Sequence, residues 1–529
     1  MAARRRGADT NLIDAVDRLT RADRLTRNLE GGGAHLGNAI HVLPALHLMR
    51  AQLLQGKGEL ARSTGNTHRT HLMGVPLEQD PALMLRFEAT LGEACLRAAL
   101  EAGNAEEAEG VDREAARNER LDEARRALTA AHKAMTELAG DGRVDVAALR
   151  KAAGADFDPA KVYTTWHDVE LWQGKPAGAV IALARGAAVL PQDAAQALAA
   201  QMCETAQERT QGAIAVRELA RLAGDDAAMR WFLARARFIQ SLEERKDRKT
   251  APALASVRAS RADFEKAVAD SPGFDAGTRI WLAYTWLAEG ALAFEDRQLD
   301  EAGDAMIKAL EATVDAAGAT DFSGWTTKTY LEAIGGRHYQ AGTLDKGVAL
   351  LDRALNLLPA DAGLLNNKAF LLREQGVRKA RSAPDEARKL FEASWETYKK
   401  AVTHSPEDVR LLNDTALIDV HYLHRDKDGS RAILERAIEL GDKQLRDQPP
   451  ATDDERKPRE EAIGDACMNL GKLLLEQFDD PAGARKALEK SKDYWRPSHA
   501  DVRALLGRVE RREQGDGKDG KDDKDGGDR

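Results

Sequence analysis

The sequence predicts an all-α protein built as a solenoid, in which pairs of helices repeat along the chain. Residues 361–369, which follow Pro359, read DAGLLNNKA, and residues 408–416, which follow Pro406, read DVRLLNDTA. Aromatic residues make up only 5% of the 529 residues. Alanine, leucine, arginine and glutamate dominate instead, which favours helices. A chain of this length exceeds what one compact core supports, whereas stacked repeats extend their core however long the chain grows.

A matching helical pattern precedes each of these two segments. It consists of a small residue, a large one four positions on, a small one three further and a proline five beyond. Two short amphipathic helices cannot bury both apolar faces alone, so such a unit is stable only when it stacks on further copies. The pattern is made by Gly347, Leu351, Ala354 and Pro359, and again by Ser394, Tyr398, Ala401 and Pro406.

This pattern resembles the tetratricopeptide repeat (TPR) family. The resemblance covers residues 255–500 well and residues 31–250 only loosely. It implies a right-handed superhelical solenoid of helix-turn-helix repeats, degenerate in its N-terminal half, whose first helices line a concave face. Small residues let helix axes approach closely, so we expect Ala354 to be buried between helices.

The composition divides the chain into four parts. Residues 1–30 predict an N-terminal helix, and residues 31–270 predict degenerate helical repeats. Residues 271–512 predict a regular TPR-like array closed by a capping helix. Residues 513–529 alternate Gly, Lys and Asp without an apolar side chain, so we expect a disordered charged tail.

Several local patterns in the N-terminal half make narrower predictions. Residues 64–81 read as a loop or broken turn, and residues 243–249, EERKDRK, as a charged insertion. Trp172 has helical spacing, which predicts a core position and not an exposed platform for a ligand. The three cysteines lie in alanine-rich helical patterns without a CxxC, so they read as small core residues in a reducing compartment: Cys95, Cys203 and Cys467.

Charge and hydropathy exclude some classes of function. A net charge of -9 spread over the whole chain gives no nucleic-acid signature. No stretch approaches the ~18 to 20 apolar residues that a membrane span needs. The N-terminal residues lack the apolar region of a signal peptide, so a cytoplasmic protein is expected unless a leader lies upstream.

The sequence holds no catalytic signature that we can name. It lacks HExxH, GxSxG, a Walker lysine and the kinase loop set, so no catalytic residue, metal or cofactor is predicted. Two histidine pairs, His68 with His71 and His421 with His424, have the spacing of one helical turn. Two imidazoles alone are weak evidence for a metal site.

The predicted binding site is a peptide groove. In the family, an asparagine at the sixth position of a first helix makes two hydrogen bonds to the backbone of an extended peptide. Asn367 and Asn469 fall at that position here, and Asp414 takes it in the repeat between them. An alternative is that such asparagines only satisfy local backbone groups. By the same register, the side chains facing this groove would be Asn366, Phe370, Arg373, Arg410, Asn413, His421, Asp465 and Lys472.

Three classes of function stay open on the sequence. The first, and the one we favour, is a non-enzymatic scaffold that binds a peptide or a partner protein of unknown identity. The second is an enzyme or metal-binding protein whose site lies in the divergent N-terminal half, where His35, His41, His68 or His71 could gather. The third is an architectural subunit that uses its repeats for self-assembly. Neither the partner nor the oligomeric state follows from the sequence.

Overall fold

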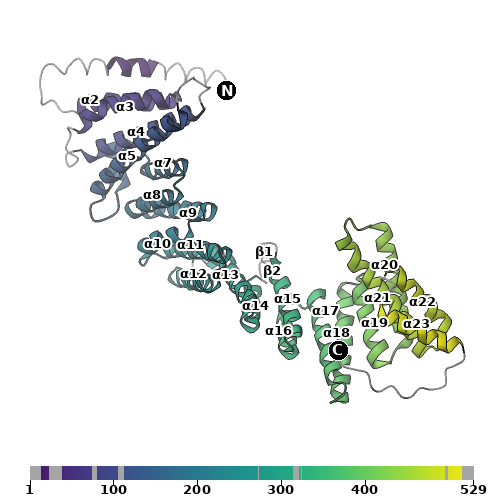
Figure 1. Cartoon of the computed structure of the whole chain (residues 1–529). Coiled ribbons are helices and arrows are strands. Elements are labelled where there is room, and N and C mark those ends of the chain that lie inside the picture. The colour runs from purple at the N-terminus through teal and green to yellow at the C-terminus, as the bar shows by residue number, and fades with distance from the viewer. Residues whose placement is uncertain are drawn as a thin grey trace, which may run out of the picture. The chain divides into compact units, whose positions relative to one another are not determined.

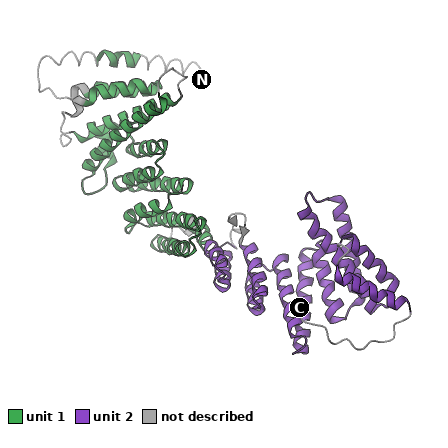
Figure 2. Cartoon of the chain, viewed as in Figure 1, with its two compact units in different colours: residues 1–285 green, residues 286–529 purple. Residues whose placement is uncertain are grey.

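A computed structural model shows a chain of helices, as predicted (Figure 1). The residues it describes are 14–22, 39–73, 80–104, 112–271, 273, 275–313, 321–322, 325–494 and 499–514. The chain divides into two compact units, residues 1–285 and residues 286–529 (Figure 2), and each is described by itself below. No helix in the described part is both long and apolar enough to cross a membrane.

In the first unit each helix packs on the next one along the chain, so the architecture is a succession of helix pairs. A helix over residues 14–22 precedes them, and α13 (Asp275–Glu295) crosses into the second unit. The remaining helices are α2 (Ala39–Leu54), α3 (Gly58–Met73), α4 (Pro81–Asn104), α5 (Arg113–Ala139), α6 (Val146–Ala153), α7 (Pro159–Trp172), α8 (Pro176–Val189), α9 (Gln192–Arg209), α10 (Gly212–Ala223), α11 (Ala227–Lys246) and α12 (Thr250–Asp270).

The second unit repeats the arrangement more regularly. Here α15 also contacts α17, and α19 also contacts α21, so helices two apart in sequence are neighbours, as stacked helix pairs require. A two-residue antiparallel hairpin, β1 (Asp321–Phe322) with β2 (Trp325–Thr326), precedes α15. The helices are α14 (Leu299–Thr313), α15 (Thr327–Gln340), α16 (Leu344–Leu357), α17 (Ala362–Lys379), α18 (Pro384–His404), α19 (Val409–Ile418), the π-helical turn η4 (Asp419–Leu423), α20 (Lys427–Asp447), α21 (Asp453–Gln477), α22 (Pro481–Tyr494) and α23 (Ala500–Glu513).

The repeated residues have the roles that their pattern predicts. Asp361 and Asp408 cap α17 and α19, where their carboxylates accept hydrogen bonds from backbone amides of the first turn. Ala354 is 0% exposed. A Cβ at Gly347 would stand 2.8 Å from a Leu371 methyl carbon, so only glycine permits this approach. The small residues therefore set the distance between stacked helices.

The cysteine prediction is confirmed. Cys95 and Cys203 are buried in the core of the first unit, and Cys467 is buried in the core around α19 to α23. All three are free thiols. Burial raises the pKa of each thiol, that of Cys203 and Cys467 to about 12. These residues are therefore inert packing groups.

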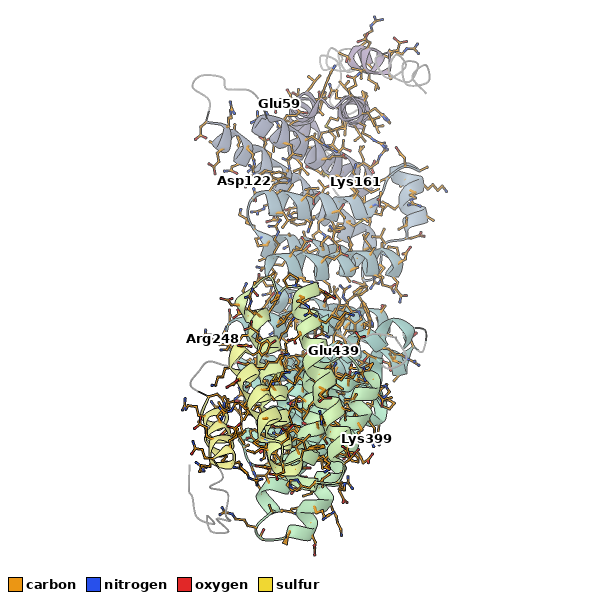
Figure 3. All side chains as sticks on the ribbon, turned by 90° about the vertical axis from the view of Figure 1, so that its right-hand side faces the viewer. Glu59, Asp122, Lys161, Arg248, Lys399 and Glu439 are labelled. Atoms are coloured by element: carbon orange, nitrogen blue, oxygen red, sulfur yellow. The ribbon has the colours of Figure 1, made fainter. Side chains whose placement is uncertain are left out.

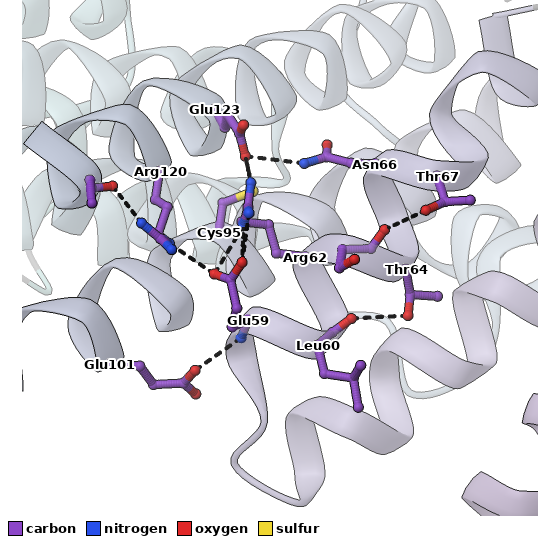
Figure 4. A network of polar contacts seen from close by, with 12 residues as sticks. Glu59, Leu60, Arg62, Thr64, Asn66, Thr67, Cys95, Glu101, Arg120 and Glu123 are labelled. Carbon is purple, nitrogen blue, oxygen red and sulfur yellow. Dashed lines mark hydrogen bonds and ion pairs between the residues drawn. The ribbon is translucent and has the colours of Figure 1, made fainter. Parts of the chain in front are cut away.

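The loop predicted over residues 64–81 is wrong in its first half, because α3 continues to Met73. Polar contacts with neighbouring helices hold this segment, although its own sequence is rich in Thr, Ser, Gly and Asn. Figure 4 shows the network: Glu59 accepts from Arg62 (2.6 Å) and Arg120 (2.8 Å), and Arg62 also donates to Glu123 (2.7 Å). Tertiary contacts thus override the weak helix propensity.

Two further predictions from the N-terminal half are corrected by the structure. Trp172 is 48% exposed, not buried, because it ends α7; the Arg117 guanidinium covers its ring at 4.9 Å. The charged residues 243–249 are not an insertion. They form the last turn of α11 and the tight turn into α12, where Arg248 (labelled in Figure 3) has a left-handed backbone with φ 60°. The predicted tail lies outside the described residues beyond Gln514.

Candidate functional site

Part of the predicted groove forms one continuous chain of hydrogen bonds in the second unit. The Lys472 ammonium donates to His421 Nδ1 (3.0 Å), and His421 Nε2 donates to Asn469 Oδ1 (3.0 Å). The Asn469 amide donates to Asn413 Oδ1 (2.9 Å), and the Asn413 amide donates to Asp414 Oδ1 (3.0 Å). Every link runs in the same direction, from a cation on α21 to a carboxylate on α19.

The direction of this chain fixes the protonation of His421. An ammonium can only donate, so Nδ1 of His421 must accept from Lys472 and its proton lies on Nε2. Burial lowers the pKa of His421, and the charge of Lys472 lowers it further, while the hydrogen bond to Asn469 opposes them. The imidazole is therefore neutral at pH 7 and links a donor to an acceptor.

Asn469 does not have the role that the sequence assigned to it. Asn469 and Asn413 are only 1% and 2% exposed. A peptide clamp needs a free donor and a free acceptor, but both amide groups of Asn469 are used inside the chain. The close packing of α19 on α21 has buried it, so Asn469 ties these two helices together.

A wide turn positions His421. The helix α19 opens into η4, and Asp419 at its start is fully buried. The Asp419 carboxylate accepts from the Ser430 hydroxyl (3.0 Å) and from the backbone amides six and seven residues on (3.0 and 3.1 Å). Single π-helical turns are frequent at functional sites, where they redirect a side chain. Here the turn is anchored from below by a carboxylate.

Two partly buried carboxyl groups lie beside this chain. Burial raises the pKa of Asp465 to about 6, with Arg410 lowering it and the charge of Asp414 raising it further. Burial likewise raises the pKa of Asp414, against Arg373 and Arg410. Neither carboxylate forms an ion pair with any residue that the structure describes. Both therefore keep acceptor capacity for a donor from outside the chain.

Arg373 and Phe370 belong to the same region. The Arg373 guanidinium donates to Glu374 Oε1 (2.8 Å) and covers the Phe370 ring at 4.8 Å. Its positive charge also reaches Asp414, as the pKa of that carboxyl shows. The predicted residues of α17 and α19 thus share one electrostatic environment.

A cavity of about 350 Å³ lies where α17 and α19 begin, and it contains an unsatisfied amide. Asn366 and Arg410 line it. The Asn366 Oδ1 atom is buried, and no described residue forms a hydrogen bond with this amide. Its neighbour Asn367, predicted as the clamp, instead donates to the Gly363 carbonyl of its own helix (3.0 Å). Asn367 therefore satisfies local backbone, and the free amide is that of Asn366.

A second, larger cavity continues from Arg410. Its volume is about 750 Å³, and the turn into α19, the end of α20 and the first half of α21 line it. Arg410 stands in the lining of both cavities, and its guanidinium donates to the Pro458 carbonyl (3.3 Å). Both cavities are open enough to admit an extended chain.

The helix-pair geometry matches that of solved repeat proteins only in outline. Similar structures include the C-terminal part of a TPR repeat-containing protein from Cytophaga hutchinsonii, at 11% identity and a TM-score of 0.32, covering 58% of this chain and 98% of that one. They also include a tetratricopeptide repeat protein from Parabacteroides merdae, at 12% identity and a TM-score of 0.22, covering 66% of this chain and 99% of that one. The TPR domain of P58(IPK) matches at 13% identity and a TM-score of 0.22, covering 76% of this chain and 99% of that one. No protein-family model matches the sequence, and no curated protein matches it significantly.

The repeat architecture is TPR-like. This description rests on the stacked helix pairs, the capping aspartates and the small residues between helices that the chain itself shows. The matches to solved structures describe what the chain is similar to and say nothing of its partner.

One polar residue in this TPR-like array was missed by the sequence reasoning. Tyr398 on α18 was assigned to packing, and it is 0% exposed as expected. However, its hydroxyl has no hydrogen-bond partner among the described residues. Burial raises its pKa, and the charge of Asp414 raises it further, so the two groups are close. A tyrosine in place of phenylalanine at a buried repeat position was the available signal, since its polar tip needs a partner.

The histidine pairs do not form a metal site in the described residues, where no group of three potential ligands gathers. The Lys472 ammonium occupies His421 Nδ1, and the Gln477 amide lies 2.8 Å from His424 Nδ1. A cation beside the imidazole opposes the binding of a metal ion. In the other half, the side chains of His35, His41 and His71 lie outside the described residues.

Proposed function

We propose that the second unit binds an extended peptide segment of a partner protein, and that the chain acts by binding and not by catalysis. The Asn366 amide carries this proposal, because it lines a cavity beside Arg410 without a hydrogen bond to the described residues. A buried amide without a partner costs about 1 to 3 kcal/mol, and a bound chain would recover this cost.

The chemistry of an amide suits a peptide backbone. Asn366 offers one acceptor and two donors, so it can bond to both the N–H and the C=O of one peptide unit. Arg410 stands at the junction of the two cavities and can hold a carbonyl or a carboxylate of the same chain. The peptide would thus be held by its backbone at α17 and by Arg410 where it passes α19.

The two carboxyl groups define a preference for the partner. Asp414 and Asp465 are acceptors without a cation in direct contact among the described residues. A lysine or arginine side chain of the bound peptide would supply the positive charge that both groups lack, and it would stabilise their ionised forms. We therefore propose that the preferred peptide has a basic side chain near its centre.

The test uses the full-length chain and a displayed random peptide library. Peptides selected on the wild type are titrated by calorimetry against Asn366→Ala and against Asn367→Ala as the matched control. Two lost hydrogen bonds at about 0.5 to 1.5 kcal/mol each predict a loss of affinity of roughly 5-fold to 100-fold for Asn366→Ala. Asn367→Ala should bind like the wild type, because its amide is used within α17. Equal affinity of both variants and the wild type would refute the role of Asn366.

A further inference from the structure

The first unit contains a cavity of about 400 Å³ between α2, α4 and the start of α7. Volumes of this size are typical of sites for small ligands. The lining combines charged side chains with apolar surface. The cationic side chains are Arg50, Arg86, Arg97 and Lys161, the acidic ones are Glu93, Asp156 and Asp158, and the large apolar ones are Leu53, Leu54, Phe157 and Val162.

The acidic side chains of this cavity are already engaged. Asp156 forms an ion pair with Arg50, and Glu93 accepts from the Lys161 ammonium (2.7 Å), a residue labelled in Figure 3. Asp158 caps α7, where it accepts from the backbone amide two residues on (3.0 Å). None of the three is left to neutralise a further cation.

Arg86 is the cation that remains. It stands on α4, half-buried, and within the described part of the chain its guanidinium donates no hydrogen bond and forms no ion pair. Burial lowers its pKa, and the charge of Arg50 lowers it further, against the weaker effect of Asp156. The absence of a side chain at Gly154 makes room for it, since a Cβ there would stand 3.3 Å from Arg86 Nη2. A desolvated guanidinium beside a like charge needs an anion.

Neighbouring groups point to the same kind of ligand. Burial lowers the pKa of His47, and the charges of Arg86 and Arg50 lower it further, so the local potential is positive. Thr165 is 8% exposed and lines the same cavity, and its hydroxyl makes no hydrogen bond among the described residues. It is thus a second donor of the kind that oxyanions accept.

The cavity continues into an apolar rim. Leu54 is 77% exposed, the largest exposure of a large hydrophobic side chain in the described residues. A neighbouring cavity of about 570 Å³ shares Leu53, Leu54 and Arg97 with the first and adds Leu100. An apolar group attached to the anion would cover this exposed surface.

We infer that this cavity binds a small organic oxyanion, a carboxylate or a phosphate monoester, that carries a short apolar chain. Arg86 holds two oxygens of the anion through its planar guanidinium, the Thr165 hydroxyl donates to it, and the apolar chain lies on Leu53 and Leu54. This inference is independent of the peptide site in the second unit.

The test measures the thermal midpoint of the full-length chain at constant ionic strength and pH 7.5. The probes are inorganic phosphate, hexyl phosphate and hexanoate, with chloride as the salt control and hexanol as the neutral control. A ligand that binds only the folded chain raises the midpoint in proportion to the logarithm of its concentration above Kd. We expect at least one of the two hexyl anions to raise the midpoint at 10 mM, and hexanol and chloride to leave it unchanged. Hexyl phosphate alone identifies a phosphate ester, and hexanoate alone a carboxylate.

The variants assign the effect to the cavity. Arg86→Gln should fold well, because it removes a repulsion with Arg50, and should weaken binding at least ten-fold by calorimetry. Thr165→Val should weaken it a few-fold. The matched control is Arg221→Gln, an exposed arginine on α10, which should bind like the wild type. The inference is overturned if neither hexyl anion binds at 10 mM, or if Arg86→Gln binds as tightly as Arg221→Gln.

Discussion

Replacing Asn469 by alanine should destabilise the second unit strongly, although the sequence reading of this residue predicts almost no effect. The change removes hydrogen bonds to His421 (3.0 Å) and Asn413 (2.9 Å) at a position that is 1% exposed. It leaves His421 Nε2–H and Asn413 Oδ1 without a partner. Each abandoned group costs about 1 to 3 kcal/mol, so the free energy of unfolding should fall by about 2 to 5 kcal/mol.

The assay is urea unfolding followed by circular dichroism, together with hydrogen exchange of the α19 and α21 peptides. Exchange localises the effect, because the two units need not unfold together. Asn367→Ala is the matched control: the same atoms are removed, but only one bond to the chain's own helix is lost. It should cost less than about 1 kcal/mol. An Asn469→Ala variant that unfolds within 0.5 kcal/mol of the wild type would show that the hydrogen-bonded chain adds nothing to stability, which would refute this reasoning.

The remaining predictions concern single positions. Ala354→Arg should unfold the array around α16, because the site is 0% exposed and overpacking alone costs about 1 to 3 kcal/mol; a wild-type melting curve would contradict the register. Trp172→Ala should cost only about 1 kcal/mol, not the ~3 to 5 of a core tryptophan, as urea unfolding can measure. Asp465 has a folded pKa of about 6, above its ordinary 3.8, so its contribution to stability is lost as pH rises from about 4 to 6. Asp465→Asn should therefore raise the unfolding free energy by about 1 kcal/mol at pH 7 and by nothing near pH 3.5; equal pH profiles of variant and wild type would contradict this.

The sequence by itself determined the architecture. The spacing of Gly347, Ala354 and Pro359 is a local property, because small residues every helical turn admit a neighbouring helix whatever the rest of the chain does. The capping aspartates Asp361 and Asp408 are local as well, and both have the predicted role. The same register brought the polar residues of α17, α19 and α21 into one region.

Only the tertiary structure decided which of these polar groups is free. Asn366, Asn367 and Asn469 are chemically alike, and periodicity gives the face of a helix but not the depth of its contact with the next one. The packing of α19 on α21 buried Asn469 in a network, the helix of Asn367 took up its amide, and the cavity at the start of α17 left Asn366 open. Arg86 was invisible for the same reason: a free guanidinium is defined by which carboxylates have other partners, and those partners are distant in the sequence.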